Sequence, residues 1–78
     1  MIVSVITPDK TIFSGELELV KLPGIDGSFE IMNQHAPLVS ILGAGEIKMV
    51  DHQKKVQTVQ IKGGVIEVNN NVVKILAE

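Results

Sequence analysis

The sequence predicts an all-β fold, a small flattened β-sandwich or barrel of nine or ten short antiparallel strands. Valine and isoleucine supply 21 of the 78 residues, and such β-branched side chains suit pleated surfaces. Apolar and polar residues alternate over short stretches that turn residues interrupt. No window keeps the 3.6-residue period of an amphipathic helix. Residues 1–78 are therefore expected to form one domain.

Composition excludes several classes of function. The chain has no cysteine, which rules out disulfides, thiolate metal ligands and cysteine nucleophiles. Its net charge of −2, its lack of arginine and its two phenylalanines without tyrosine or tryptophan argue against a nucleic-acid partner. No apolar run approaches the ~20 residues of a membrane span, and the first residues have no basic targeting segment. We expect neither nucleic-acid binding nor direct membrane insertion.

The first predicted strands are Ile2–Ile6 and Thr11–Ser14. Pro8 and Asp9 mark the turn between them, because proline pre-sets φ and aspartate closes Asx-turns. Gly15 then indicates a bulge or a close approach of another group. The pattern predicts a hairpin at the start of the chain.

Residues 16–22 form the next predicted strand, with Leu17 and Leu19 on its inner face. The alternation slips at Leu19-Val20 without a turn residue, which indicates a bulge or a strand buried on both faces. A turn is predicted at residues 23–27.

The chain then breaks twice around one short piece. The predicted strand 28–33 lies between the turn at 23–27 and a second break at 33–37, which Pro37 ends. Leu38–Leu42 reads as a short buried strand. Turn-forming residues on both sides of one short strand predict a corner of the sheet with two loops in defined positions.

Four more strands complete the predicted sheet, separated by turns rich in glycine, asparagine and polar residues. They cover Glu46–Val50, Val56–Ile61, Val65–Val68 and Val72–Ala77. Each begins or ends next to one of the turns Gly43–Gly45, Asp51–Lys55, Gly63-Gly64 and Asn69–Asn71.

No residue pattern predicts catalysis, a metal or a cofactor. His35 and His52 have no ligand-spaced partners, no serine lies in a G-x-S-x-G elbow, and the glutamates occupy outward positions. His52 reads as a solvated loop residue. For His35 two interpretations stay open, a ring that hydrogen-bonds its own loop and a contact with a partner. A small enzyme that uses surface carboxylates has no motif in its favour.

Lys48-Met49 offers an alternative function, a carrier domain modified at Lys48. Biotinyl and lipoyl carriers are also small all-β domains, but their lysine lies at an exposed hairpin tip. Here Lys48 falls within a predicted strand, and the nearest hairpin tip is at residues 51–55.

Four segments together resemble the N-terminal β-sandwich of the epsilon subunit of the F-type ATP synthase. The segments are Thr7–Gly15, Leu22–Leu38 with its Pro23-Gly24 and His35-Ala36-Pro37 elements, Gly63–Val68 and Asn69–Glu78. The resemblance implies a non-catalytic rotor subunit of the central stalk. It implies gamma and the c-ring as partners and a peripheral place on the cytoplasmic face of the inner membrane.

The resemblance also implies two contact regions. Asp26, Gly27 and Ser28 are expected to face the polar loops of the c-ring. The expected gamma side consists of Thr7, His35, Ala36, Pro37 and Ser40.

The sequence departs from the family pattern in two places. Glu30 stands where a glycine is usual, so we expect a less sharply bent loop and a different charge facing the ring. The family's C-terminal helical hairpin would begin at Glu78, so no inhibitory or ATP-sensing arm is expected within these residues.

Overall fold

The all-β prediction is confirmed. The computed structural model describes residues 1–78 as nine strands and no helix, so no helix is present that could cross a membrane. The strands are β1 (Ile2–Ile6), β2 (Thr11–Glu16), β3 (Leu19–Gly24), β4 (Gly27–Met32), β5 (Leu38–Leu42), β6 (Gly45–Val50), β7 (Val56–Ile61), β8 (Gly64–Asn69) and β9 (Val72–Ala77).

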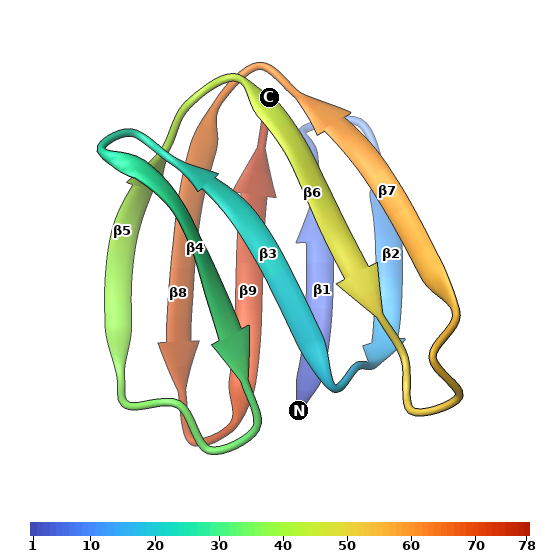
Figure 1. The fold of residues 1–78 in the computed structure, drawn as a ribbon. Helices are drawn as coiled ribbons and strands as arrows, with labels where there is room; N and C mark the ends of the chain where they lie inside the picture. Colours follow the sequence, from blue (N-terminus) through green and yellow to red (C-terminus); the bar gives the residue numbers. More distant parts are fainter.

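All nine strands belong to one sheet that curls into two layers (Figure 1). The front layer is β4-β3-β6-β7, and the back layer is β5-β8-β9-β1-β2. The layers join where β3 and β5 pair at a single position, Gly24 opposite Leu42. The expectation of an entirely antiparallel sheet is wrong at one pairing, because β1 and β9 run parallel. These two strands come from opposite ends of the chain, and no local sequence signal indicates that they pair.

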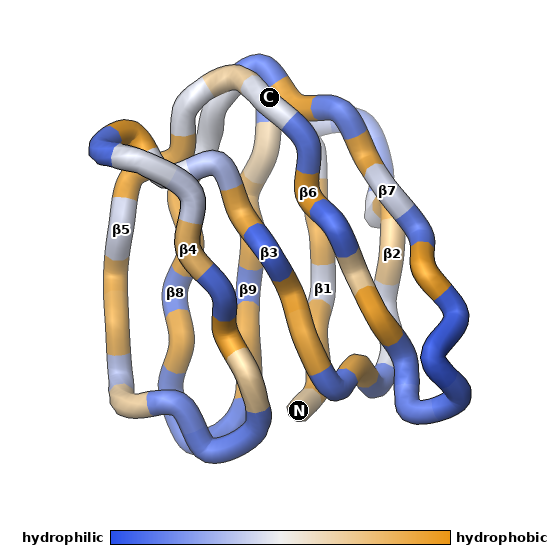
Figure 2. Tube along the Cα trace, viewed as in Figure 1, coloured by the Kyte–Doolittle hydropathy of each residue, from blue (hydrophilic) through white to orange (hydrophobic).

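Sixteen apolar residues fill the space between the layers, and no polar side chain is buried there. Their source is the alternation seen in the sequence, visible in Figure 2 as orange and blue bands along β6, β8 and β9. Inward-facing Ile47, Ile66 and Ile75 are fully buried. At ~25 cal/mol per Å² of apolar surface, this core is the main source of stability in so small a domain.

The shift in the apolar–polar alternation at Leu19-Val20 is caused neither by a bulge nor by a strand buried on both faces. β2 ends at Glu16, and β3 begins only at Leu19. Leu17 in the connection is buried, but Leu19 is only half-buried, and Val20 occupies the inner face. The inward placement predicted for Leu19 is therefore wrong, because the strand break resets the phase.

Two predicted turns also differ in detail. The first turn is closed by the Thr7 hydroxyl, which donates to the Lys10 carbonyl at 3.1 Å, rather than by Asp9. The turn expected at 23–27 contains only Ile25 and Asp26, because β3 continues to Gly24 and β4 starts at Gly27. Gly27 has a φ of 129°, a value that favours glycine and allows the chain to reverse direction in a two-residue turn.

Candidate functional site: the outer face of the back layer and two loops

The structure separates the predicted site residues into two groups (Figure 1). Asp26 and Gly27 lie at the β3–β4 tip, together with Ser28, the second residue of β4. His35, Ala36 and Pro37 lie in the β4–β5 loop at the opposite end of the sandwich. The two groups therefore lie at opposite ends of β4.

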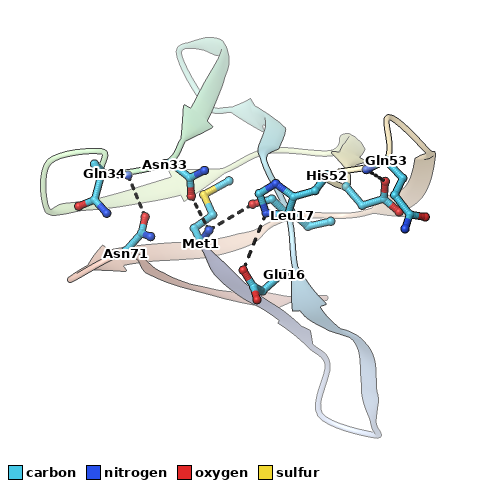
Figure 3. Close-up of polar contacts among 9 residues, drawn as sticks. Met1, Glu16, Leu17, Asn33, Gln34, His52, Gln53 and Asn71 are labelled. Atoms are coloured by element: carbon cyan, nitrogen blue, oxygen red, sulfur yellow. Dashed lines mark hydrogen bonds and ion pairs between the residues drawn. The ribbon is translucent and has the colours of Figure 1, made fainter.

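The β4–β5 loop is held by defined hydrogen bonds (Figure 3). The Gln34 amide, in a residue with a φ of 64°, donates to Asn71 Oδ1 at 2.8 Å. The His35 amide donates to the Met32 carbonyl, and its Nδ1 donates to the Ala36 carbonyl at 2.7 Å. The His35 ring thus bonds its own loop, as one of the two interpretations predicts. The loop itself remains exposed.

A second contact fastens the beginning of the same loop. The Met1 amine donates to the Leu17 carbonyl at 3.2 Å and to Asn33 Oδ1 at 2.5 Å (Figure 3). These bonds join the start of β1, the β2–β3 connection and the end of β4 at the edge of the core. The loop that carries His35 is therefore fastened to both layers.

The outer face of the back layer carries a row of apolar side chains. Strand register aligns Ile41, Val65, Leu76 and Ile6 across β5, β8, β9 and β1. The first three are 58%, 40% and 56% exposed. On the same face lie three more exposed apolar residues, Val39, Ile2 and Val72. The row and Val39 are contiguous, whereas Glu67, Lys74 and Ser4 separate them from Ile2 and Val72. A contiguous exposed apolar surface is typical of an interaction site.

Two shallow grooves lie on this face, one beside Val39 and one that Ile6, Val65 and Leu76 of the row line themselves. One is lined by Pro37, Val39 and Glu67 among others, and the other includes Thr7 and Leu76. Thr7 and Pro37 were assigned to one side from the resemblance, and the structure places them along one outer face. Ser40 differs, because its register partner is the buried Ile66 and it faces inward, half-buried.

Sequence reasoning missed the strongest feature of this face. Leu38–Leu42 was expected to be buried, yet Val39 is 70% exposed and Ile41 is 58% exposed. The strand has apolar residues on both faces, so its pattern could not distinguish a buried strand from one with an uncovered apolar face. The signal was the apolar residue at each outward position of β5, beside outward Val65 on β8.

Backbone hydrogen bonds connect the β3–β4 tip to the neighbouring part of the sheet. The Ile25 amide donates to the Ile41 carbonyl at 3.1 Å, and the Gly43 amide donates to the Pro23 carbonyl at 2.8 Å. These bonds fasten the tip to β5 and to the turn after it. Ile25 is 64% exposed and Asp26 is also exposed, so the tip presents one apolar and one acidic side chain.

Other candidate residues form no reactive centre. No group of three or more histidine, cysteine or acidic residues is arranged to hold a metal. His52 is exposed, and its Nε2 lies 3.8 Å from Glu16 Oε1, between the β6–β7 loop and the end of β2. Lys48 lies within β6, away from the hairpin tip at residues 51–55 that a carrier domain would use. Glu30 lies within β4 opposite Lys21, so no bend occurs there.

Known proteins match the chain along its length. The family described as ATP synthase, delta/epsilon chain, β-sandwich domain, matches residues 1–78. The chain belongs to this delta/epsilon family. Among its relatives, the ATP synthase epsilon chain of Chlorobium limicola is 42% identical over 74 residues, which are 95% of this chain and 84% of the relative. The epsilon chain of Leptospira borgpetersenii is 41% identical over 97% of this chain, which spans 59% of that relative's length.

Solved structures share the delta/epsilon sandwich. A chain of the Euglena gracilis mitochondrial ATP synthase, in a structure of its OSCP, F1 and c-ring parts, superposes with a TM-score of 0.93 at 23% identity. The match covers 99% of this chain and 49% of that one. A chain of the Tetrahymena thermophila mitochondrial ATP synthase, from its central stalk and c-ring, gives 0.80 at 21% identity and covers 97% of this chain and 61% of that one. These matches confirm the fold.

Proposed function

We propose that this chain is the β-sandwich of an epsilon-type subunit in the central stalk of an F-type ATP synthase. In this role it has no active site of its own. It binds gamma and the c-ring, and so couples ion-driven rotation to ATP synthesis on the cytoplasmic face of the inner membrane. Family membership supports the assembly, and the exposed apolar row Ile41–Val65–Leu76–Ile6 is the observation that supports a docking function.

In this proposal, gamma covers the outer face of the back layer. Burying Val39 and Ile41 against a partner removes apolar surface from water, which favours association at ~25 cal/mol per Å². Thr7 and Pro37 border the face at the two grooves, and the exposed His35-Ala36 loop continues it. Ser40 contributes by supporting the strand from its inner face rather than by direct contact.

The β3–β4 tip reaches the c-ring in the same arrangement. Asp26, Gly27 and Ser28 are exposed, and the bonds to Ile41 and from Gly43 hold the tip in place. A tip fastened to the sheet transmits torque without bending. The separation of the tip from His35 lets one small domain contact two rotor parts at once.

The gamma interface is tested by a matched pair of glutamate substitutions. Ile41 and Met32 are 58% and 55% exposed, but they lie on opposite layers. Ile41→Glu is expected to weaken binding to purified gamma by about 100-fold, because a charge is desolvated in an apolar contact. Met32→Glu is expected to bind as the unsubstituted chain does. Equal binding by both variants in calorimetric titration, with unchanged circular dichroism, contradicts the proposed face.

The c-ring contact is tested by crosslinking in the assembled membrane complex. A photoreactive group on Ser28→Cys is expected to label the c subunit, and the same group on His35→Cys is expected to label gamma. This chain has no cysteine of its own, so each attachment site within it is unique. Labelling of gamma alone from Ser28→Cys shows that the tip does not face the ring, and leaves the gamma interface to be judged by the titration.

A further inference from the structure

The sheet has a free edge at β7 that nothing in the chain covers. The strand order ends at β2 and β7, and β4 forms the end of a branch on β3. β7 pairs with β6 over its whole length, Val56 to Ile61, and with no strand on its other side. Unpaired edges act as templates for other strands unless the sequence protects them.

Hydrogen-bond alternation shows which peptide groups face outward. The Asp51 amide donates to the Lys55 carbonyl at 3.0 Å, and in an antiparallel ladder every second opposed pair is hydrogen-bonded. Continuing from that pair, Gln57, Val59 and Ile61 use their peptide groups to bond β6. The amides and carbonyls of Val56, Thr58 and Gln60 therefore point to the free edge.

Two other edges, β2 and β4, carry protection that β7 lacks, and the exposed side of β5 is partly covered by its pairing with Gly24 and by the Ile25 amide. The β1–β2 ladder shifts register between Val5 and Ile6, a bulge that disrupts a regular edge. β4 has the charged Glu30 in its middle. β7 reads Val-Gln-Thr-Val-Gln-Ile, six residues without charge, proline or glycine. Such a segment is suited to accept another strand.

The positive charge around the β7 edge favours an incoming strand with acidic ends. Residues 45–62 hold four of the seven lysines and two of the nine acidic residues, a net charge of +2 against −4 for the remainder. Lys55 precedes β7, Lys62 follows it, and Lys48 lies opposite Thr58 on β6. None of these three lysines is in an ion pair; Lys54, by contrast, is held by Glu18.

The lysines also disfavour a second copy of the chain. In an antiparallel pairing of two β7 edges, Lys55 of one chain meets Lys62 of the other. In a parallel pairing, identical lysines meet. Like charges placed directly opposite across strands are destabilising, whereas acidic residues at both ends of an incoming strand are attracted by Lys55 and Lys62.

We propose that β7 is a strand-addition site for an extended, uncharged segment of a partner protein with acidic residues at both ends. This site lies on the front layer and is independent of the gamma face. Main-chain bonds to Val56, Thr58 and Gln60 supply the pairing, and the flanking lysines supply the preference for acidic ends.

The probe is a synthetic nine-residue peptide of alternating valine and threonine with two glutamates at each end, titrated into the isotope-labelled chain. The amide resonances of Val56, Thr58 and Gln60 are expected to shift saturably, and their hydrogen exchange is expected to slow. Lysines in place of the peptide's glutamates are expected to weaken binding about tenfold or more. Binding is also expected to fall as salt is raised.

Thr58→Pro tests the edge within the chain. It removes an outward donor without touching the bonds to β6, and proline is tolerated on edge strands, so the fold is kept while peptide binding is lost. Thr58→Val keeps the amide and is expected to bind normally. If Thr58→Pro does not fold by circular dichroism, a peptide N-methylated at alternate positions supplies the same test, because it cannot donate to the edge.

Four outcomes overturn the proposal. They are no shift at millimolar peptide, equal binding by the N-methylated peptide, equal binding by the lysine-ended peptide, and concentration-dependent pairing of the chain with itself through β7. Loss of gamma binding through Ile41→Glu has no bearing on this result.

Discussion

At a few positions the backbone takes a conformation that few residue types permit, and there a single residue controls the local structure. Gly64 begins β8 with a φ of 156°, and a Cβ there would collide with the Leu76 carbonyl oxygen of β9. Asn71 has a φ of 61° and also accepts the Gln34 amide, which comes from 37 positions earlier in the chain. Both residues were identified as turn signals in the sequence, but only their neighbours in space explain why so few residue types suit these positions.

Replacing Gly64 by alanine is expected to destabilise the domain by about 2–3 kcal/mol, from backbone strain and the clash with β9. Urea denaturation measures the change. Gly43→Ala is the control, because a Cβ at Gly43 meets no atom closer than 3.9 Å. A loss for Gly43→Ala as large as that for Gly64→Ala shows that the β8–β9 contact is not the cause.

Asn71 is expected to control the order of the His35 loop. Asn71→Gly keeps the backbone freedom but removes the acceptor, so the Gln34 amide should exchange with solvent faster and stability should fall by about 1 kcal/mol. Asn71→Asp keeps the acceptor and tolerates the same φ, and it is expected to restore slow exchange. Fast exchange of Gln34 in both variants indicates that the loop depends on other contacts.

At the scale of elements, the β6–β7 hairpin was predicted with the correct loop and with strand ends that differ only at the start of β6, which begins one residue earlier, at Gly45. Asp51 Oδ1 accepts the amides of Gln53 at 2.8 Å and Lys55 at 3.0 Å, which closes the loop from within. Side-chain-to-backbone hydrogen bonds of this kind can be predicted from sequence because donor and acceptor lie a few residues apart. The start of β3 could not be predicted in this way. There the Glu18 amide donates to the Val50 carbonyl of β6, which lies far away in the sequence.

Asp51→Ala is expected to lower the free energy of unfolding by about 1–2 kcal/mol, because two amides lose a charged acceptor. Asp51→Asn retains an acceptor oxygen and is expected to recover most of that loss. The midpoints of urea unfolding at equal m-values give the comparison. If alanine and asparagine behave alike, the carboxylate bonds do not stabilise the hairpin.

For the whole molecule, small size makes stability sensitive to partners. A 78-residue domain buries only ~60% of its unfolded surface. At a gamma concentration 100 times the dissociation constant, mass action adds ~2.7 kcal/mol. This corresponds to a rise in melting temperature on the order of 10 °C for a domain of this size. Calorimetry with and without gamma measures it, and an unchanged melting temperature at saturating gamma argues against direct binding.

The sequence by itself determined the class of fold, because alternation with period two can bury only one face of a strand and therefore requires a layered sheet. It also determined the turns, whose residues act on their own backbone, and the absence of cysteine chemistry. Strands β5 to β9 were predicted nearly to the residue for this reason.

The tertiary structure alone decided which faces remain uncovered. Val39 and Val68 are equally apolar in sequence, yet one is 70% exposed and the other 2%, because the core has only two layers and each strand has one side within it. The parallel pairing of β1 with β9 and the free edge of β7 are likewise set by strands far apart in the chain. Which surfaces stay uncovered depends on what the remaining chain leaves unpaired, and a local pattern such as the apolar residues on both faces of β5 does not show which face that is.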